Sequence, residues 1–276
     1  MTLKKLLIAN RGEIAIRILR AAADLGISSV AIFSEDDSQS LHVAKADEAA
    51  ALPGRGVPAY LDGVAILELA RKMNCDAIHP GYGFLSENAE FAVACDQAGI
   101  SFVGPGVETL RVFGDKAAAR QLAASNGVPV LPGSEGAADK SVAETFFDSH
   151  GAFMIKSIGG GGGRGMRAVL DKHKLSDALE ICQTEALQAF GNGDVFVEKL
   201  LPAPRHIEVQ IIGDGSGAIS HLGERECSIQ RRHQKLVEMA PAPGLEQVLR
   251  ERITAAAVKM AEAVDYGNLG TFEFLV

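Results

Sequence analysis

The residues best suited to chemistry in this sequence surround five consecutive glycines, 159–163. Because glycine loses the most backbone freedom on folding, such a run is expected where the backbone must approach a ligand or must move. The mostly apolar residues 153–156 and 166–170 predict strands on either side of a glycine-rich loop. Its N–H groups can bind phosphate oxygens, and Lys156, Arg164 and Arg167 add positive charge. The pattern favours a polyphosphate clamp that opens and closes, with a ligand-free hairpin tip as the alternative.

Two other glycine motifs compete for the same residues. Gly160, Gly162 and Gly165 have the spacing of the dinucleotide fingerprint, which requires a helix directly after the last glycine. A strand is predicted there instead, so the context argues against a dinucleotide site. A P-loop requires lysine and then serine or threonine after its last glycine, whereas Met166 follows Gly165. The sequence therefore excludes a P-loop.

Polar and apolar residues alternate strictly along residues 205–212. His206, Glu208 and Gln210 are predicted to point to one face of a strand, and the aliphatic residues between them to the other. An antiparallel sheet with one polar face can be solvated on that face or can line a site. A histidine, a glutamate and a glutamine in register suggest a lined site, with the solvated face as the commoner alternative.

A dense basic cluster follows at residues 224–238 of this acidic chain. His233 and Lys235 are two residues apart, so they share one face if the segment is extended. We interpret the cluster as an anion site, with a solvated charged loop as the alternative. Residues 270–276 predict a closing strand in which Glu273 faces away from the phenylalanines on either side. A lone carboxylate in an apolar strand needs a partner, which is often a metal ion.

The first third of the chain alternates strands with helices, which predicts a parallel, doubly wound sheet. Ligands of such sheets lie at the carboxyl ends of the strands. Residues 79–88 gather histidine, tyrosine, glutamate and asparagine at one strand end, which favours a site over a rigid turn with a helix cap. At another strand end, Asn10 is predicted to cap the next helix, with Glu13 close to a capping box.

The second part of the chain predicts a small α/β unit that carries the glycine loop. It is expected to read strand from Val128, helix at 140–150, strand, loop, strand, helix at 173–190 and strand. Prolines on both sides of Ala203 mark a joint at its exit, as a moving lid would require. Lys116 falls in the first turn of a predicted helix, where the helix dipole disfavours a cation. The pattern favours a surface lysine there, with a lysine recruited by an anion as the alternative.

Length, composition and charge limit the class of protein. A chain of 276 residues can hold two domains, and its net charge of −8 argues against non-specific nucleic-acid binding as its main task. No apolar run reaches membrane-spanning length, and the apolar stretch near the start is too short for a signal peptide. The four cysteines have no metal-ligand spacing and are interpreted as reduced thiols. These features predict a cytoplasmic protein.

Together these stretches resemble the biotin carboxylase family of the ATP-grasp superfamily, over the range from Lys4 to Val276. The His-Pro-Gly-Tyr-Gly stretch distinguishes this family from carbamoyl phosphate synthetases and from purine-pathway ATP-grasp ligases. One small departure is Ser157, where the family usually has alanine. The resemblance rests on residues 9–15, 79–83 with 86–88, Lys156 with 159–166, Glu198-Lys199, 205–210 and 230–235.

The resemblance implies a fold, a reaction and a set of ligands. The fold would be α/β, with a doubly wound N-terminal domain at 1–113 and an incomplete ATP-grasp region at 114–276 whose mobile lid spans about 130–201. The reaction would be ATP-dependent carboxylation of biotin by bicarbonate through carboxyphosphate, the first half-reaction of a biotin-dependent carboxylase. ATP, Mg²⁺ (or Mn²⁺) and carrier-bound biotin would take part.

The resemblance also implies roles for particular residues. Lys235 and His233 would be catalytic, with Lys235 holding bicarbonate or carboxyphosphate. Tyr82 and Gly83 would contact biotin, and Glu273 would bind the metal. The residues implied to bind ATP are Lys116, Lys156, Gly161, Gly162, Gly163, Glu198, Lys199, Leu201, His206, Gln230 and His233.

The implied partners are a biotin carboxyl carrier protein or domain, a carboxyltransferase, bicarbonate and a second copy of the full-length protein, but neither nucleic acid nor a membrane. In the family, the strand of Glu273 is followed by a second metal-binding glutamate, an asparagine, an arginine and a general-base glutamate, none of which is in this sequence. We therefore expect the chain to be truncated at its C-terminus and to be inactive alone. A non-catalytic nucleotide-binding fragment is the alternative.

Overall fold

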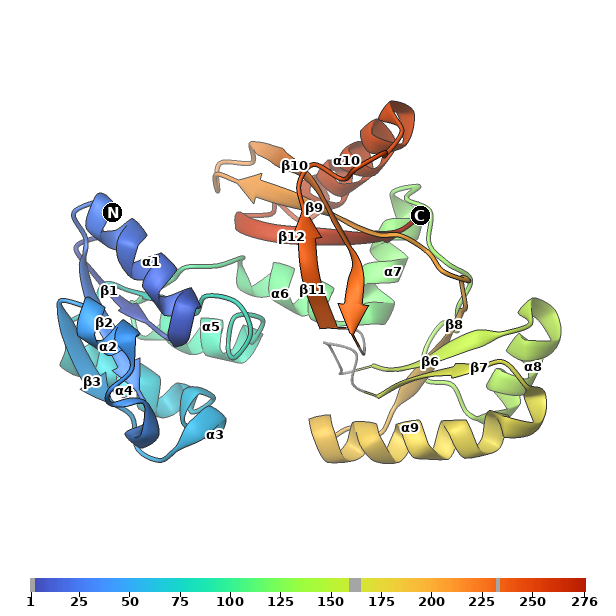
Figure 1. Ribbon diagram of the computed structural model, residues 1–276, viewed down its shortest axis with the longest axis horizontal. Coiled ribbons are helices and arrows are strands. Elements are labelled where there is room, and N and C mark those ends of the chain that lie inside the picture. Colours follow the sequence, from blue (N-terminus) through green and yellow to red (C-terminus); the bar gives the residue numbers. More distant parts are fainter. Residues whose placement is uncertain (1–2, 159–164, 232–233) are drawn as a thin grey trace. The chain divides into compact units, whose positions relative to one another are not determined.

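The computed structural model describes residues 3–158, 165–231 and 234–276 (Figure 1). The chain divides into two compact units, Met1–Arg111 and Val112–Val276. None of the helices in the described ranges is long and apolar enough to span a membrane.

The first unit is built on a five-stranded parallel sheet, as the alternating pattern predicts. Neighbouring residues of the first strand point to opposite faces, so that Leu7 packs in one core and Leu6 and Ile8 pack in another. The sheet is therefore covered on both sides, which confirms the doubly wound architecture. In sheet order the strands are β3 (Glu48–Ala51), β2 (Ser28–Phe33), β1 (Lys5–Ile8), β4 (Ala77–His79) and β5 (Ser101–Phe102).

Helices α1 (Gly12–Asp24), α4 (Gly63–Lys72) and α5 (Ala89–Gln97) pack against this sheet, and α6 (Val107–Gly114) leads from the first unit into the second. Leu19 of the first helix packs with Leu6 and Ile8, whereas Ile66 and Phe91 of two later helices pack with Leu7. The residues between β2 and the fourth helix form short elements that sequence patterns did not predict. These elements are α2 (Leu41–Lys45) and α3 (Gly56–Tyr60), with a 3₁₀ turn at Glu35–Asp37.

The predicted cap of α1 is wrong. Helix α1 begins at Gly12 after Arg11, and no side chain caps it. Asn10 instead turns its amide nitrogen toward the loop after β4, where it donates to the carbonyls of Pro80 (2.6 Å) and Tyr82 (3.0 Å). A long-range contact has replaced the local one, which a sequence pattern cannot show.

The second unit contains two antiparallel sheets (Figure 1). The smaller sheet has the order β7-β6-β8 and packs against two helices through a shared apolar core. Its elements are α8 (Lys140–His150), β6 (Phe153–Ser157), β7 (Met166–Val169), a 3₁₀ turn at Lys172–Lys174, α9 (Leu175–Phe190) and β8 (Val195–Lys199). This is the predicted α/β unit around the glycine-rich segment.

The strand expected to begin at Val128 does not form. Residues 130–135 run beside β8 and make a single bridge, between Gly133 and Glu198. Backbone bonds from Lys199 N to Pro132 O (2.8 Å) and from Ser134 N to Val197 O (2.9 Å) hold the segment in place. The segment therefore follows the edge of the sheet without joining it as a regular strand.

The larger sheet has the order β11-β10-β9-β12. Its strands and covering helices are α7 (Lys116–Ser125), β9 (His206–Gly213), β10 (Ile219–Arg231), β11 (Gln234–Met239), α10 (Gln247–Glu262) and β12 (Asn268–Leu275). The described residues of the basic cluster thus lie on the paired strands β10 and β11, and the predicted return strand at 218–222 is the start of the longer β10.

The alternating residues of β9 point to opposite faces of the sheet, as predicted. Ile207, Val209 and Ile211 are fully buried and pack in one core with residues of α10. Phe272 and Phe274 of β12 pack at the edge of the same core. Opposite this apolar face, the sheet presents polar side chains.

Candidate functional site

The polar face of the larger sheet brings together side chains that lie far apart in the sequence. The ammonium of Lys235 on β11 donates to Glu273 Oε1 on β12 at 2.7 Å and also to the carboxylate of Glu208 on β9. His206 Nε2 lies 3.4 Å from Glu273 Oε2, and Gln230 Nε2 lies 2.7 Å from the other ring nitrogen of His206. Two predicted site residues, Lys235 and His206, therefore meet at the carboxylate of a third, Glu273, and a fourth, Gln230, contacts His206.

Strand register explains this meeting. Glu273 is paired directly with Glu208 across β12 and β9, and Lys235 is paired with Gln230 across β11 and β10. Residues directly opposite each other in an antiparallel pair have neighbouring side chains on the same face. The sheet order thus determines which of the alternating polar residues come into contact.

Arg225 is a member of this cluster that sequence reasoning missed. Its Nε donates to Glu208 Oε1 (2.7 Å) and its Nη1 donates to Gln210 Oε1 (2.9 Å). The Glu208 side chain is only 3% exposed, so its charge needs compensation. Arg225 lies opposite Glu208 across β10 and β9, a register that the sequence did not reveal.

The electrostatics of the cluster keep its charged groups ionised. Burial raises the pKa of Glu208, but the nearby ammonium of Lys235 and the guanidinium of Arg225 outweigh it and hold that pKa below its usual range. A hydrogen bond with His206 and the charge of Lys235, acting against burial, lower the pKa of Glu273 to about 2. Burial would lower the pKa of Lys235, yet its two carboxylate partners raise it.

The chemistry of this cluster suits an ionic ligand. His206, Glu208 and Glu273 offer one donor atom each within 4.8 Å of one another, a spacing at which they could hold a metal ion. Glu273 is the more accessible carboxylate, because its side chain is 52% exposed. The ammonium of Lys235 could hold an anion beside such an ion. The site thus offers a carboxylate that can bind a cation and an ammonium that can bind an anion.

A second cluster surrounds Glu198 at the end of β8. Its carboxylate accepts from Lys156 of β6 and, through Oε1, from Arg120 Nη1 of α7 at 2.7 Å. Arg120 also donates to the carbonyl of Leu131 at 2.5 Å. Arg120 is a second residue that the sequence analysis missed, because its partners are remote in the chain. Next to Glu198, Lys199 is exposed.

Lys116 contacts the smaller sheet, β7-β6-β8. It begins α7, whose N-cap Asp115 accepts from two backbone N–H groups. The Lys116 ammonium donates to the carbonyl of Ser157 at 2.8 Å and lies 6.0 Å from the ring centre of Phe196. The expectation of a plain surface lysine is therefore wrong: Lys116 is directed to the strand that leads into the glycine run.

Several predicted residues lie outside the described part of the chain. Gly161, Gly162 and Gly163 belong to residues 159–164, and His233 belongs to residues 232–233. At the edge of the first gap, Ser157 N donates to Gly165 O at 3.1 Å. Among the other ATP-site predictions, Leu201 is partly buried just after β8.

The predicted biotin residues belong to the first unit. Tyr82 and Gly83 lie in the loop after β4, at the carboxyl end of the parallel sheet, where ligands of such folds bind. Tyr82 is 64% exposed, and its hydroxyl donates to Glu13 of α1. Gly81 N donates to His79 Nδ1 at 3.0 Å, which tightens the turn.

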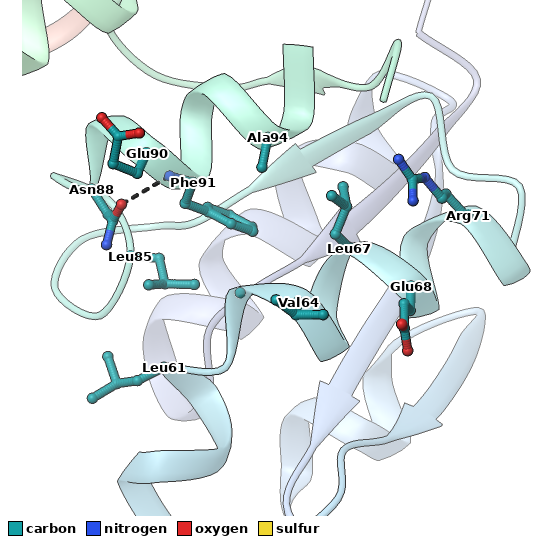
Figure 2. A pocket seen from close by; sticks show the side chains of 11 residues that line it. Leu61, Val64, Leu67, Glu68, Arg71, Leu85, Asn88, Glu90, Phe91 and Ala94 are labelled. Carbon is teal, nitrogen blue, oxygen red and sulfur yellow. Dashed lines mark hydrogen bonds between the residues drawn. The ribbon is translucent and has the colours of Figure 1, made fainter. Parts of the chain in front are cut away.

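A separate pocket of about 310 Å³ lies between α4 and α5 (Figure 2). Its lining is mainly apolar, with Leu67, Leu85 and Phe91 on its walls. Asn88 caps α5 by accepting from Phe91 N at 2.8 Å. Of the residues predicted to bind ATP, biotin or metal, none of those that the structure describes lines this pocket.

Comparison with known proteins places both units in one family. The biotin carboxylase N-terminal domain matches residues 2–110, and the carbamoyl-phosphate synthase L chain ATP-binding domain matches residues 115–276. A pyruvate carboxylase of Staphylococcus aureus is 51% identical over 278 residues, which cover 99% of this chain and 24% of that protein. The chain thus spans about a quarter of the length of such curated relatives.

Solved structures of biotin carboxylases resemble this chain over its whole length. A biotin carboxylase of Campylobacter jejuni in complex with β,γ-ATP superposes with a TM-score of 0.97 at 44% identity, covering 100% of this chain and 62% of that one. The biotin carboxylase domain of a Hydrogenobacter thermophilus 2-oxoglutarate carboxylase, a dimer with MgADP, ADP and bicarbonate, gives 0.95 at 44% identity, covering 100% and 61%. The chain therefore belongs to the biotin carboxylase family, with the N-terminal domain of that family followed by an ATP-binding domain.

Proposed function

We propose that the protein carboxylates biotin in an ATP-dependent reaction with bicarbonate. Bicarbonate oxygen would attack the γ-phosphate of ATP, releasing ADP and forming carboxyphosphate. Carboxyphosphate would then deliver CO₂ to the ureido nitrogen of biotin and release phosphate. The observation that carries this proposal is the convergence of Lys235, His206 and Glu273 on one sheet face in a chain of this family.

The residues around Glu273 fit a magnesium ion bound together with nucleotide. Mg²⁺ in nucleotide sites is usually held by one or two carboxylates, by phosphate oxygens and by water. Glu273 supplies a carboxylate that is ionised, as its pKa of about 2 indicates, and accessible. Glu273 would hold the ion, whose chemistry would be to offset the negative charge of the phosphates. Glu208 is a less suitable ligand, because Lys235 and Arg225 already occupy its two oxygens.

The lysines near Glu198 and the lysine beside Glu273 would then have separate roles. Phosphoryl transfer depends on positioning and on electrostatic stabilisation of negative charge. Lys116 and Lys156 would contact nucleotide phosphates, and Lys156 would exchange the carboxylate of Glu198 for them. Lys235 would hold bicarbonate or carboxyphosphate, in place of part of its present contact with Glu273.

The remaining predicted contacts complete the proposal. Glu198, Lys199 and the Leu201 backbone would face adenine, and His206 and Gln230 would face the ribose. His233 would join Lys235 as a catalytic residue, and the glycines at 161–163 would close over the phosphates. Residues 130–201 would move as a lid of the domain at 114–276, and the domain at 1–113 would present Tyr82 and Gly83 to biotin.

Partners follow from the chemistry of the product. Carboxybiotin must be carried to an acceptor, which requires a biotin carboxyl carrier protein or domain and a carboxyltransferase. The curated relatives are pyruvate carboxylases, and the Hydrogenobacter structure is a dimer, which supports a second copy of the full-length protein as a further partner.

The test is ADP release by the purified full-length protein with ATP, Mg²⁺, bicarbonate and free biotin. We expect ADP formation that requires bicarbonate and rises with biotin, together with ¹⁴C-bicarbonate incorporated into biotin. A Lys235→Gln variant should lose both signals while it retains nucleotide binding. Nucleotide binding without biotin-dependent ADP release in the wild-type protein would favour a non-catalytic nucleotide-binding protein instead.

A further inference from the structure

Asn10 is fully buried. It follows the carboxyl end of β1 and contacts the loop that follows the neighbouring strand β4. Both hydrogens of its side-chain amide are used on one loop, because Nδ2 donates to Pro80 O (2.6 Å) and to Tyr82 O (3.0 Å). Its Oδ1 accepts from the Arg11 backbone N–H at 2.9 Å. One side chain therefore ties the start of α1 to two carbonyls of the loop after β4.

The loop is shaped to receive this amide. Gly81, between the two bonded carbonyls, has φ +69°, a conformation that favours glycine. A Cβ at Gly81 would lie 2.7 Å from Asn10 Nδ2 and 2.7 Å from Ile14 Cγ2. The missing side chain leaves the space in which the amide reaches both carbonyls. Asn10 thus fits the loop in shape at Gly81 and bonds it at the carbonyls of Pro80 and Tyr82.

These contacts fix the exposed part of the loop. Tyr82 contributes its carbonyl to Asn10 and its hydroxyl to Glu13, so the residue is held at its backbone and at its tip. An unpaired buried amide is costly, whereas a paired one rigidifies its surroundings. The exposed ring and the following Gly83 are therefore presented by a loop whose base is anchored inside the unit.

We propose that Asn10 is a positioning residue for biotin, which acts by holding the 80–83 loop in the conformation that presents Tyr82 and Gly83. This proposal rests on the proposed function of that loop. Asn10 itself touches no substrate, because it is buried beneath the loop. Its loss should therefore weaken biotin recognition without affecting the nucleotide site.

The test compares Asn10→Ala and Asn10→Asp with Asn126→Ala in the full-length protein. Asn126 is a matched control, because its amide also donates to a backbone carbonyl, Leu122 O at 2.8 Å, but in the second unit. Loss of two hydrogen bonds to the loop should raise KM for biotin about tenfold, which corresponds to about 1.4 kcal/mol. KM for ATP and the biotin-independent ATPase rate should stay unchanged, and Asn126→Ala should change neither KM.

Two further measurements separate positioning from general destabilisation. If Asn10 acts through the loop, combining Asn10→Ala with Tyr82→Ala should raise KM for biotin by less than the product of the single effects. Hydrogen exchange of the peptide covering 79–88 should accelerate about tenfold in Asn10→Ala, while β9 to β12 exchange as before. This second readout does not depend on turnover, so it tests the anchoring even if the protein carboxylates no biotin.

An unchanged KM for biotin in an active Asn10→Ala variant would overturn the proposal. Unchanged exchange of the 79–88 peptide would also overturn it, because the loop would then not depend on the Asn10 amide. A uniform loss of turnover with both KM values unchanged would assign Asn10 a structural role only. If Asn10→Asp does not fold, the Asn10→Ala data decide the question alone.

Discussion

Replacing Glu198 by glutamine should destabilise the second unit through the loss of one charge. The Glu198 carboxylate holds Arg120 at 2.7 Å and also Lys156, and the three side chains are 11%, 21% and 23% exposed. Glutamine keeps the shape and one acceptor, but it leaves two cations without their anion. Arg120 links α7 to the segment beside β8, so the loss affects the junction between α7 and the smaller sheet.

The magnitude follows from the burial of the pair. Exposed ion pairs contribute about 0–1 kcal/mol, whereas removing one partner of a fully buried pair costs about 3–5 kcal/mol. The side chains around Glu198 are partly buried, so we expect Glu198→Gln to lower the free energy of unfolding by about 2–3 kcal/mol. For a unit of this size, that loss lowers the melting temperature by about 5–10 °C.

Differential scanning calorimetry of the wild-type protein and the Glu198→Gln variant measures this shift. Glu185→Gln is the matched control, because its pair with Arg167 in the same unit has side chains that are 46% and 41% exposed. The control should change stability by no more than about 0.5 kcal/mol. Equal decreases in melting temperature for the two variants would refute the argument that burial makes the ion pairs of Glu198 contribute to stability.

Three other changes test separate parts of the structure. Lys156→Ala should weaken ATP binding by about 1.5–3 kcal/mol through the loss of a charge-assisted phosphate contact, and calorimetric titration showing unchanged affinity would contradict the proposed role. Arg11 holds the pKa of Asp37 well below its usual range, so the stability that this carboxylate gives is present above its unfolded pKa of about 3.9 and is lost as the pH falls toward the folded value. Unfolding of Asp37→Asn in urea should therefore show a smaller loss of stability than the wild type between about pH 5 and about pH 2, and parallel curves would count against it. Gly213→Ala should lower the melting temperature strongly, because its Cβ would lie 1.7 Å from Tyr266 O; a variant that melts like the wild type would show that the backbone there can move.

Local patterns by themselves determined much of this protein. Alternation along β9 predicted its buried and polar faces, because successive side chains of a strand point to opposite sides whatever the partner. The alternation of strands and helices predicted the parallel sheet, and the glycine run was correctly placed between two strands. The type of each element and the faces of each strand depend on neighbouring residues alone, and strands that alternate with helices are joined by the crossovers that a parallel sheet requires.

Only the tertiary structure decided which distant residues meet. Arg120 lies 78 positions from Glu198, and Arg225 became a partner of Glu208 through the pairing register of β9 and β10. Asn10 had the local signature of a helix cap, but it bonds a loop 70 residues away. Register and sheet order arise from the packing of the whole chain, and a buried polar group takes the partner that folding brings to it. For that reason the strands could be predicted from local patterns, whereas the contacts that organise the site could not.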